Sequence, residues 1–229
     1  MTILLYHPMC PHSRFIRLAL SEYGIDADLV EEKVQERRQD FLALNPAGTT
    51  PVLLEEPDIV VCGAGPAAEY LHEVYAVSSP VRLMPDNPVE RAEVRRLTDW
   101  FNTKFFAEVS MWLVHEKITR RFLAANQGGG GPDMDAVRAA RANIRSHLGY
   151  IGWLASKRNW LAGDEMSYAD LAAAAHLSCA DYLGDVPWAE NENAKNWYVR
   201  VKSRPSFRAL LGDRVVGMNP APVYADLDF

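Results

Sequence analysis

The side chain best suited to chemistry in this sequence is the thiol of Cys10, in the run Cys10-Pro11-His12-Ser13. An apolar run precedes it and a helical pattern follows it, so we expect Cys10 between a strand and a helix N-terminus. Backbone N–H groups at such a terminus favour an anion and lower the pKa of a thiol. Cys10 is therefore a candidate nucleophile; the competing interpretation is a small residue in a tight turn.

The other reactive residue types form no recognisable set. The three cysteines are scattered without C-x-x-C spacing, which argues for a reducing compartment and against a disulfide framework or a zinc site. His115-Glu116 begins like a metalloprotease motif, but Thr119 stands where the second histidine is required. We therefore expect no metal site.

The stretch 45–71 is expected to position this cysteine. Thr50-Pro51 leads into the apolar run 52–54, and because proline lacks an N–H we expect Pro51 at the start of an edge strand. A proline in a tight turn can follow a cis peptide bond, and we expect Thr50–Pro51 to be cis. A second apolar run, 59–62, follows a short turn and indicates a hairpin that leads into a helix.

Earlier elements complete this unit. Residues 2–7 are predicted to form the first strand, a helix is predicted from the Cys10 turn to about Tyr23, and residues 27–34 are predicted as the second strand. The order is β-α-β followed by β-β-α, which predicts an α/β domain over residues 1–76.

The rest of the chain has a helical pattern. Residues 77–86 are predicted as a linker, and residues 87–229 as an all-α domain. Asn87 is a good N-cap for a helix that we expect to continue to about Ala125. Four successive glycines, 128–131, predict a flexible connection.

Two signals mark later helices. Apolar residues recur every three or four positions over 134–151, which predicts an amphipathic helix. Ser167 followed by Asp170 is a capping-box pattern and precedes a run of small residues. We expect it to start a central, buried helix.

The order of elements and the cis-proline signal resemble the glutathione S-transferase superfamily, whose N-terminal domain is thioredoxin-like and whose C-terminal domain is all-helical. The resemblance implies a glutathione site at Thr50, Pro51 and Val52. It also implies an acidic residue and a serine before the next helix, but Gly63 and Ala64 stand there. Weak or absent glutathione binding is therefore expected, and restoring the pair is expected to strengthen it.

The strings over 158–188 and 194–214 and the ending 224–229 resemble one branch of this superfamily, the FtsZ-binding, glutathione-transferase-like division proteins of bacteria. This resemblance implies a cytoplasmic protein at the division site that binds FtsZ polymer, alone or with other divisome proteins. It also implies no cofactor, a homodimer, and a C-terminal tail that takes part in function.

The C-terminal tail is unusually apolar for a solvated end and alternates with acidic residues. We expect it either to pack on the body or to be a recognition motif. A basic groove that meets its acidic residues is expected either on this protein, with two arginines as candidates, or on a partner. The predicted partner-binding residues are Tyr224, Asp226, Leu227, Asp228, Phe229, Arg120 and Arg121.

Composition sets further bounds. The chain has 229 residues, 48% of them hydrophobic, and a formal net charge of −6, which argues against nucleic acid as the main partner. No apolar run approaches the roughly 20 residues of a membrane span, and the N-terminus lacks the pattern of a signal peptide. The favoured interpretation is a non-catalytic FtsZ-binding protein. The alternatives are a glutathione-dependent thiol transferase or reductase that uses Cys10, and a small-molecule binding protein.

Overall fold

A four-stranded sheet, in the order β2-β1-β3-β4, forms the first part of the computed structural model, which describes residues 1–227. β1 pairs in parallel with β2 and antiparallel with β3, and β3 pairs antiparallel with β4. The elements of this part are β1 (Thr2–Tyr6), α1 (Pro11–Glu22), β2 (Asp28–Glu31), α2 (Gln39–Leu44), β3 (Val52–Glu55), β4 (Ile59–Cys62) and α3 (Ala64–Tyr75).

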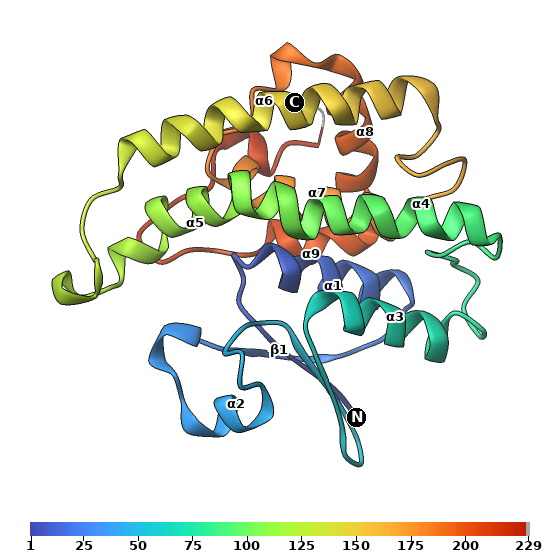
Figure 1. The fold of residues 1–229 in the computed structure, drawn as a ribbon, viewed down its shortest axis with the longest axis horizontal. Helices are drawn as coiled ribbons and strands as arrows, with labels where there is room; N and C mark the ends of the chain where they lie inside the picture. The colour runs from blue at the N-terminus through green and yellow to red at the C-terminus, as the bar shows by residue number, and fades with distance from the viewer. Residues whose placement is uncertain (228–229) are drawn as a thin grey trace.

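Both faces of the sheet are covered, because successive strand residues point to opposite sides. Leu4 and Leu53 belong to the main core with Phe15 of α1, whereas Leu5 and Val52 pack with Phe41 of α2. Figure 1 accordingly shows α1 and α3 on the side of the sheet nearer the helical domain, and α2 on the opposite side. The arrangement is thioredoxin-like.

The Thr50–Pro51 peptide bond is cis, as predicted. The expectation of an edge strand after it was wrong, because Val52 lies in register with Leu5 of β1 and with Cys62 of β4. The strand begins at Val52, so the missing N–H of Pro51 falls just outside the ladder. At the edge of the sheet opposite β4, the strand β2 is shorter than predicted, and all of its residues are exposed.

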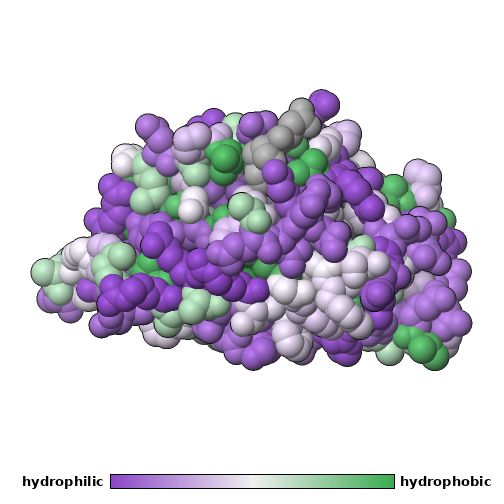
Figure 2. All heavy atoms as spheres, turned by 90° about the horizontal axis from the view of Figure 1, so that it is seen from above, coloured by the Kyte–Doolittle hydropathy of each residue, from purple (hydrophilic) through white to green (hydrophobic). Residues whose placement is uncertain are grey.

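The second part of the chain is helical. Its elements are α4 (Pro88–Asp99), the π-helical segment η2 (Trp100–Ser110), α5 (Met111–Lys117), α6 (Met134–Lys157), α7 (Tyr168–Tyr182), α8 (Glu192–Lys202) and α9 (Arg208–Leu211). Short 3₁₀ turns lie at Val34–Glu36, Thr119–Arg121, Ala125–Gln127, Trp188–Glu190, Pro205–Phe207 and Pro222–Tyr224. Seen from above in Figure 2, the outer surface is mostly polar with small, separate apolar areas.

The first long helix ends earlier than Ala125, where we expected it to stop. α5 ends at Lys117, and a 3₁₀ turn over Thr119–Arg121 follows it, which the glycine segment contacts. Gly130 donates its N–H to the carbonyl of Arg120 at 3.1 Å. Four glycines therefore allow the chain to fold back and close this end of the helix.

α7 is the central helix, and every one of its residues is buried. The predicted capping box is confirmed: the Ser167 hydroxyl accepts from Ala169 N–H, and Asp170 accepts from Ser167 N–H at 3.0 Å. Asp170 also accepts from the indole of Trp197 at 2.8 Å. The cap therefore joins α7 to α8 as well as starting the helix.

Glu93 on α4 offers a test of the packing between α4 and the end of α6. It accepts hydrogen bonds from Arg96 at 2.8 Å and from Arg158 at 2.7 Å. The hydrogen bonds from Arg96 lower the pKa of Glu93, burial raises it, and the bond from Arg158 lowers it further. The resulting pKa is about 2. Since this value lies below that of the unfolded chain, about 4.3, the resulting stability is present at neutral pH and is lost as the pH falls toward 2.

We expect Glu93→Gln to lower the free energy of unfolding at pH 7 by about 1–2 kcal/mol, allowing for solvent screening of a side chain that is 24% exposed. The difference from wild type should shrink between pH 4.5 and pH 3. Urea denaturation at three pH values measures it, with the exposed Glu90→Gln on the same helix as control. A difference that is the same at every pH would contradict the assignment.

Candidate functional site

A cavity of about 480 Å³ lies where the sheet domain meets the helical domain, and we call it the Cys10 cavity. Its floor comes from the Cys10 turn and Thr50, and its apolar wall from Phe106, Met111 and Val114 of η2 and α5. Cys10 is the N-cap residue of α1 and is partly buried. Its Sγ lies 3.5 Å from the carbonyl oxygen of Thr50.

The thiol of Cys10 is acidified by its neighbours. Burial raises its pKa, but a hydrogen bond and the charge of His12 lower it more strongly, with further hydrogen bonds from Ser13 and Thr50, so that the pKa is about 7. The pKa of His12 is raised: burial lowers it, and the bond to Cys10 more than compensates. Both shifts favour a thiolate–imidazolium pair near neutral pH.

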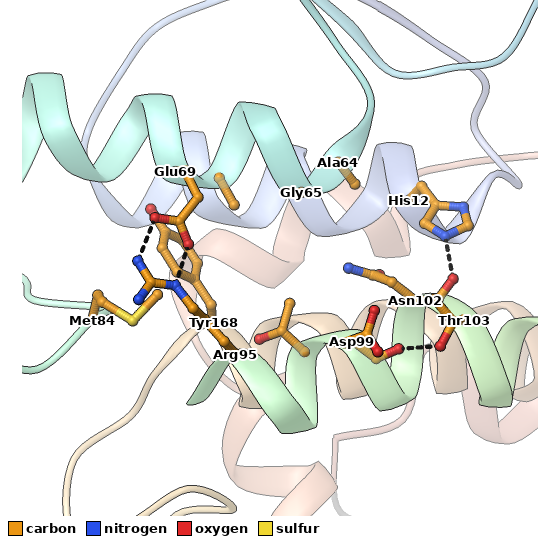
Figure 3. A pocket seen from close by; sticks show the side chains of 12 residues that line it. His12, Ala64, Gly65, Glu69, Met84, Arg95, Asp99, Asn102, Thr103 and Tyr168 are labelled. Atoms are coloured by element: carbon orange, nitrogen blue, oxygen red, sulfur yellow. Dashed lines mark hydrogen bonds and ion pairs between the residues drawn. The ribbon is translucent and has the colours of Figure 1, made fainter. Parts of the chain in front are cut away.

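Residues of the helical domain position the side chain of His12. Its Nε2 lies 2.9 Å from the carbonyl oxygen of Asn102, the contact drawn in Figure 3. Its ring packs against Phe106 at 4.6 Å and against His176 at 5.2 Å between centroids. Neither Asn102 nor Phe106 was singled out from the sequence, because no local motif announces a contact that spans ninety residues.

A second cavity, of about 370 Å³, adjoins the first and lies between α3 and α4 (Figure 3). The two share His12 and Ala64. At its far end Arg95 of α4 donates two hydrogen bonds of 2.8 Å to Glu69 of α3. This ion pair therefore joins the sheet domain to the helical domain at the boundary where both cavities lie.

Two family models match the chain. Residues 4–79 match the glutathione S-transferase N-terminal domain and residues 131–205 match the C-terminal domain. A glutathione S-transferase structure from Sinorhizobium meliloti superposes with a TM-score of 0.97 at 51% identity, covering 100% of both chains. The chain belongs to the glutathione S-transferase family.

Within this family the similarity extends to a protein whose name refers to FtsZ. FtsZ-localized protein A of Caulobacter vibrioides is 45% identical over 229 residues, with 98% of this chain and 97% of that protein covered. The structure of FzlA from C. crescentus superposes with a TM-score of 0.93 at 44% identity, covering 100% and 99% of the two chains. Glutathione S-transferase GstB of Escherichia coli is 27% identical, with coverage of 85% and 83%.

The expected glutathione positions lie at or behind the Cys10 cavity. Thr50 lines it, whereas Pro51 and Val52 are buried behind Thr50. Gly63 and Ala64 form part of its wall, so the place where the family pattern has an acidic residue and a serine faces the cavity without a polar side chain. Weak or absent glutathione binding at this site stays a prediction.

The described residues of the tail differ in their exposure to solvent. Tyr224 is fully buried, and its hydroxyl contacts Arg14 at 3.1 Å and the carbonyl of Leu210 at 2.8 Å. The ring therefore fixes the tail to the body, which was one of the two expected alternatives, and a role of Tyr224 in partner binding stays a prediction. Asp226 and Leu227 are exposed, and Asp228 and Phe229 lie outside the described residues.

The two arginines that were candidates for a basic groove contact other groups in the structure. Arg120 pairs with Glu116 at 2.7 Å, and Arg121 donates to the carbonyl of Gly217 at 3.2 Å. The cation near Asp226 is instead Lys202, whose pKa is lowered by burial and held up by the charges of Asp181 and Asp226. The tail therefore meets α8, which the sequence pattern did not indicate.

Over residues 1–227, no cluster of three or more metal-ligating side chains has the arrangement of a metal site. In the same part of the chain, no helix is both long and apolar enough to cross a membrane.

Proposed function

We propose that this chain is an FtsZ-associated protein of the division site, in which the glutathione-transferase fold serves as a binding scaffold. The full-length similarity to FtsZ-localized protein A, at 45% identity, carries the proposal. The apolar wall at Gly63 and Ala64 supports it, because a glutathione enzyme needs polar groups to hold the charged end of its ligand. The proposed partner is FtsZ polymer, with other divisome proteins as further partners.

A cytoplasmic homodimer would suit this role. Two-fold symmetry presents two copies of any docking surface, so weak contacts can cross-link or curve a filament through effective concentration. The test is co-sedimentation of the purified chain with GTP-assembled FtsZ, beside its sedimentation without FtsZ. Recovery in the pellet only with polymer is expected; equal recovery with and without polymer would sink the proposal.

We expect Asp226→Lys to weaken FtsZ co-sedimentation about 5- to 30-fold, the effect of 1–2 kcal/mol. Asp226 is exposed at the end of the tail, so its carboxylate is accessible to a partner. The matched control is Asp164→Lys, a reversal at another exposed aspartate. Because the new lysine would face Lys202, thermal melting is measured as well, and Asp226→Asn separates charge loss from repulsion. Normal co-sedimentation by both tail variants would make the tail a bystander.

A second candidate function is thiol chemistry at Cys10, favoured by the pKa of about 7 beside His12 in an open cavity. The two functions differ in what they need from the sulfur. We expect Cys10→Ala to leave FtsZ co-sedimentation and complementation of division unchanged, because a scaffold does not use the thiolate. Loss of division with a normal melting temperature would instead favour a glutathione-dependent thiol transferase or reductase.

A further inference from the structure

A small apolar cluster, distinct from the main core, joins the C-terminal tail to the turn that precedes α1. Its five buried members come from separate parts of the chain: Met9, Ile118, Cys179, Tyr182 and Tyr224. Met9 belongs to the turn, Ile118 follows α5, and Tyr224 belongs to the tail. The ring of Tyr224 stands edge-on to the ring of Tyr182, with 5.1 Å between their centroids. The packing around Met9 therefore includes a residue of the tail.

Arg14 makes a polar connection between the same two parts of the chain. Its Nη1 donates to the hydroxyl of Tyr224 at 3.1 Å, and its Nε donates to the carbonyl oxygen of Pro8 at 2.6 Å. Its Nη2 lies 3.1 Å from the sulfur of Met9. One fully buried guanidinium thus contacts both the tail and the turn. Because a buried cation requires its hydrogen-bond acceptors, loss of the acceptor in the tail should also disturb the turn.

Hydrogen bonds hold the segment 218–224, which we call the strap, against the helices. The hydroxyl of Tyr182 donates to the carbonyl oxygen of Met218 at 2.9 Å. The buried ammonium of Lys202 donates to the carbonyl oxygen of Val223 at 2.9 Å. These bonds are made to the main chain, so they hold the strap whatever its exposed side chains are.

Tyr224 provides the one fully buried side chain of the strap. Among residues 218–227 it alone is buried, and the others are exposed or partly exposed. A segment with so few buried contacts can detach at a lower free energy than unfolding of the core requires. Detachment of the strap therefore depends mainly on whether the Tyr224 ring leaves its place.

The strap lies behind a cavity wall. A third cavity, of about 390 Å³, is lined by Met9 and Ile118, and Met9 also lines the Cys10 cavity. Both residues belong to the cluster that Tyr224 completes. Within the described part of the chain, the strap adds no side chain to the lining of either cavity. Tyr224 is therefore placed as a wedge behind the wall and not as a lid over a cavity mouth.

We propose that the strap is a conformational device with a seated and a released state, and that seating of Tyr224 fixes the Pro8–Met9 turn and the cavity wall that Met9 forms. On release, Arg14 loses the tyrosine hydroxyl and Met9 loses a neighbouring ring, so the turn loosens. The coupling is reciprocal: whatever fixes the turn retains the strap, and a partner that draws away the tail frees the turn. The proposal depends neither on FtsZ association nor on thiol chemistry.

The test is amide hydrogen exchange of the full-length protein, followed by mass spectrometry of peptides that cover the turn. The N–H of Cys10 donates to the carbonyl of His7 at 3.0 Å, so its exchange rate measures opening of the turn. Tyr224→Ala should speed this exchange about 10- to 100-fold, because it removes the ring and a hydrogen bond to a charged group. Tyr224→Phe keeps the ring and should speed it about three- to tenfold.

Two controls separate release of the strap from general loss of stability. Val223→Ala shortens an exposed strap side chain and keeps the carbonyl that Lys202 contacts, so exchange at the turn should stay within about twofold of wild type. Peptides of α6 are compared in every variant. Release of the strap should leave their exchange unchanged, whereas global unfolding would speed it as well.

The reverse direction is measured by chymotrypsin cleavage after Tyr224, which a buried ring prevents. Met9→Ala should speed this cleavage about 5- to 50-fold, because it removes packing from the other side of the cluster. Met9→Leu conserves the volume, loses the sulfur contact with Arg14, and should give a smaller increase. The matched control is Met134→Ala, at an exposed methionine of α6, which should be cleaved like wild type.

Each result supports or overturns the coupling. Faster exchange of the turn in Tyr224→Ala with unchanged α6, together with faster tail cleavage in Met9→Ala, is expected. Unchanged exchange of the turn in Tyr224→Ala, or unchanged tail cleavage in Met9→Ala, would refute it. Equal acceleration of the turn and of α6 would also overturn it, since Tyr224 would then support the whole fold and not a separate strap.

Discussion

Replacing Arg14 by leucine is expected to lower the free energy of unfolding by about 3–5 kcal/mol, the usual effect of breaking a buried charged network. The side chain of Arg14 is fully buried in α1. It donates to the carbonyl of Pro8 at 2.6 Å and to the hydroxyl of Ser178 at 2.8 Å, and it pairs with Asp213 at 3.2 Å. Leucine satisfies none of these acceptors, and Asp213 would keep its ion pair with Arg17.

Urea denaturation of Arg14→Leu and wild type measures this effect. The control is Arg208→Leu, an exposed arginine of α9, which should change stability by less than about 0.5 kcal/mol. A loss below about 1 kcal/mol for Arg14→Leu would mean that the network does not hold the domains together. Because Arg14 also contacts the hydroxyl of Tyr224, the same variant should increase proteolysis of the tail.

Local signals in the sequence predicted much of the fold, because each depends on residues close in the chain. Thr50-Pro51 marked a cis bond, Asn87 marked the start of α4, and Ser167 with Asp170 marked the start of α7. In each case the side chain or ring restricts the backbone of its own turn, so no knowledge of distant packing is needed.

The site depended on distant contacts, and here sequence patterns were insufficient. Cys10 was identified from its place before a helix, but the group that positions His12 is a main-chain carbonyl in a π-helical turn, which no residue type signals. The sequence left two possibilities open for Tyr224, packing on the body or a place in a recognition motif. Its burial follows from Arg14, a charged residue that an amphipathic pattern assigns to the surface.

The core pattern that determines the fold also could not predict the branch of the family. The thioredoxin-like and helical domains require only the core pattern, which enzymes and binding proteins share. The residues that we propose to separate the two functions are Gly63 and Ala64 of the cavity wall, together with exposed residues of the tail. Long matching strings pointed to the FtsZ-associated branch, and the 45% identity to FtsZ-localized protein A agrees with them.

Glutathione is expected to bind the wild type weakly or not at all, and Ala64→Ser is expected to raise its affinity roughly 10- to 100-fold. Ala64 begins α3 and lines the Cys10 cavity, where the family pattern has a serine. A hydroxyl there can donate to the carboxylate of the ligand, and a hydrogen bond to a charged group contributes about 1.5–3 kcal/mol.

Restoring both family residues is expected to add less than the sequence pattern suggested. Gly63 has φ 90° and ψ 154°, a conformation that side chains with a Cβ rarely adopt. Space is not the obstacle, since an added Cβ would lie 3.7 Å from the nearest atom, on Pro66. Gly63→Glu therefore introduces backbone strain of about 1–3 kcal/mol, which offsets the hydrogen bond that its carboxylate would make.

Calorimetric titration with glutathione separates these effects in wild type, Ala64→Ser and the double variant. The matched control is Ala68→Ser, one turn later in α3, which lines only the second cavity and should bind no better than wild type. Micromolar binding by the wild type would contradict the expected weakness, and equal binding by Ala64→Ser would show that a serine alone does not rebuild the site. If the double variant binds far better than Ala64→Ser, the strain at Gly63 is smaller than its backbone angles imply, and loss of the acidic residue rather than of the serine separates this cavity from a glutathione site.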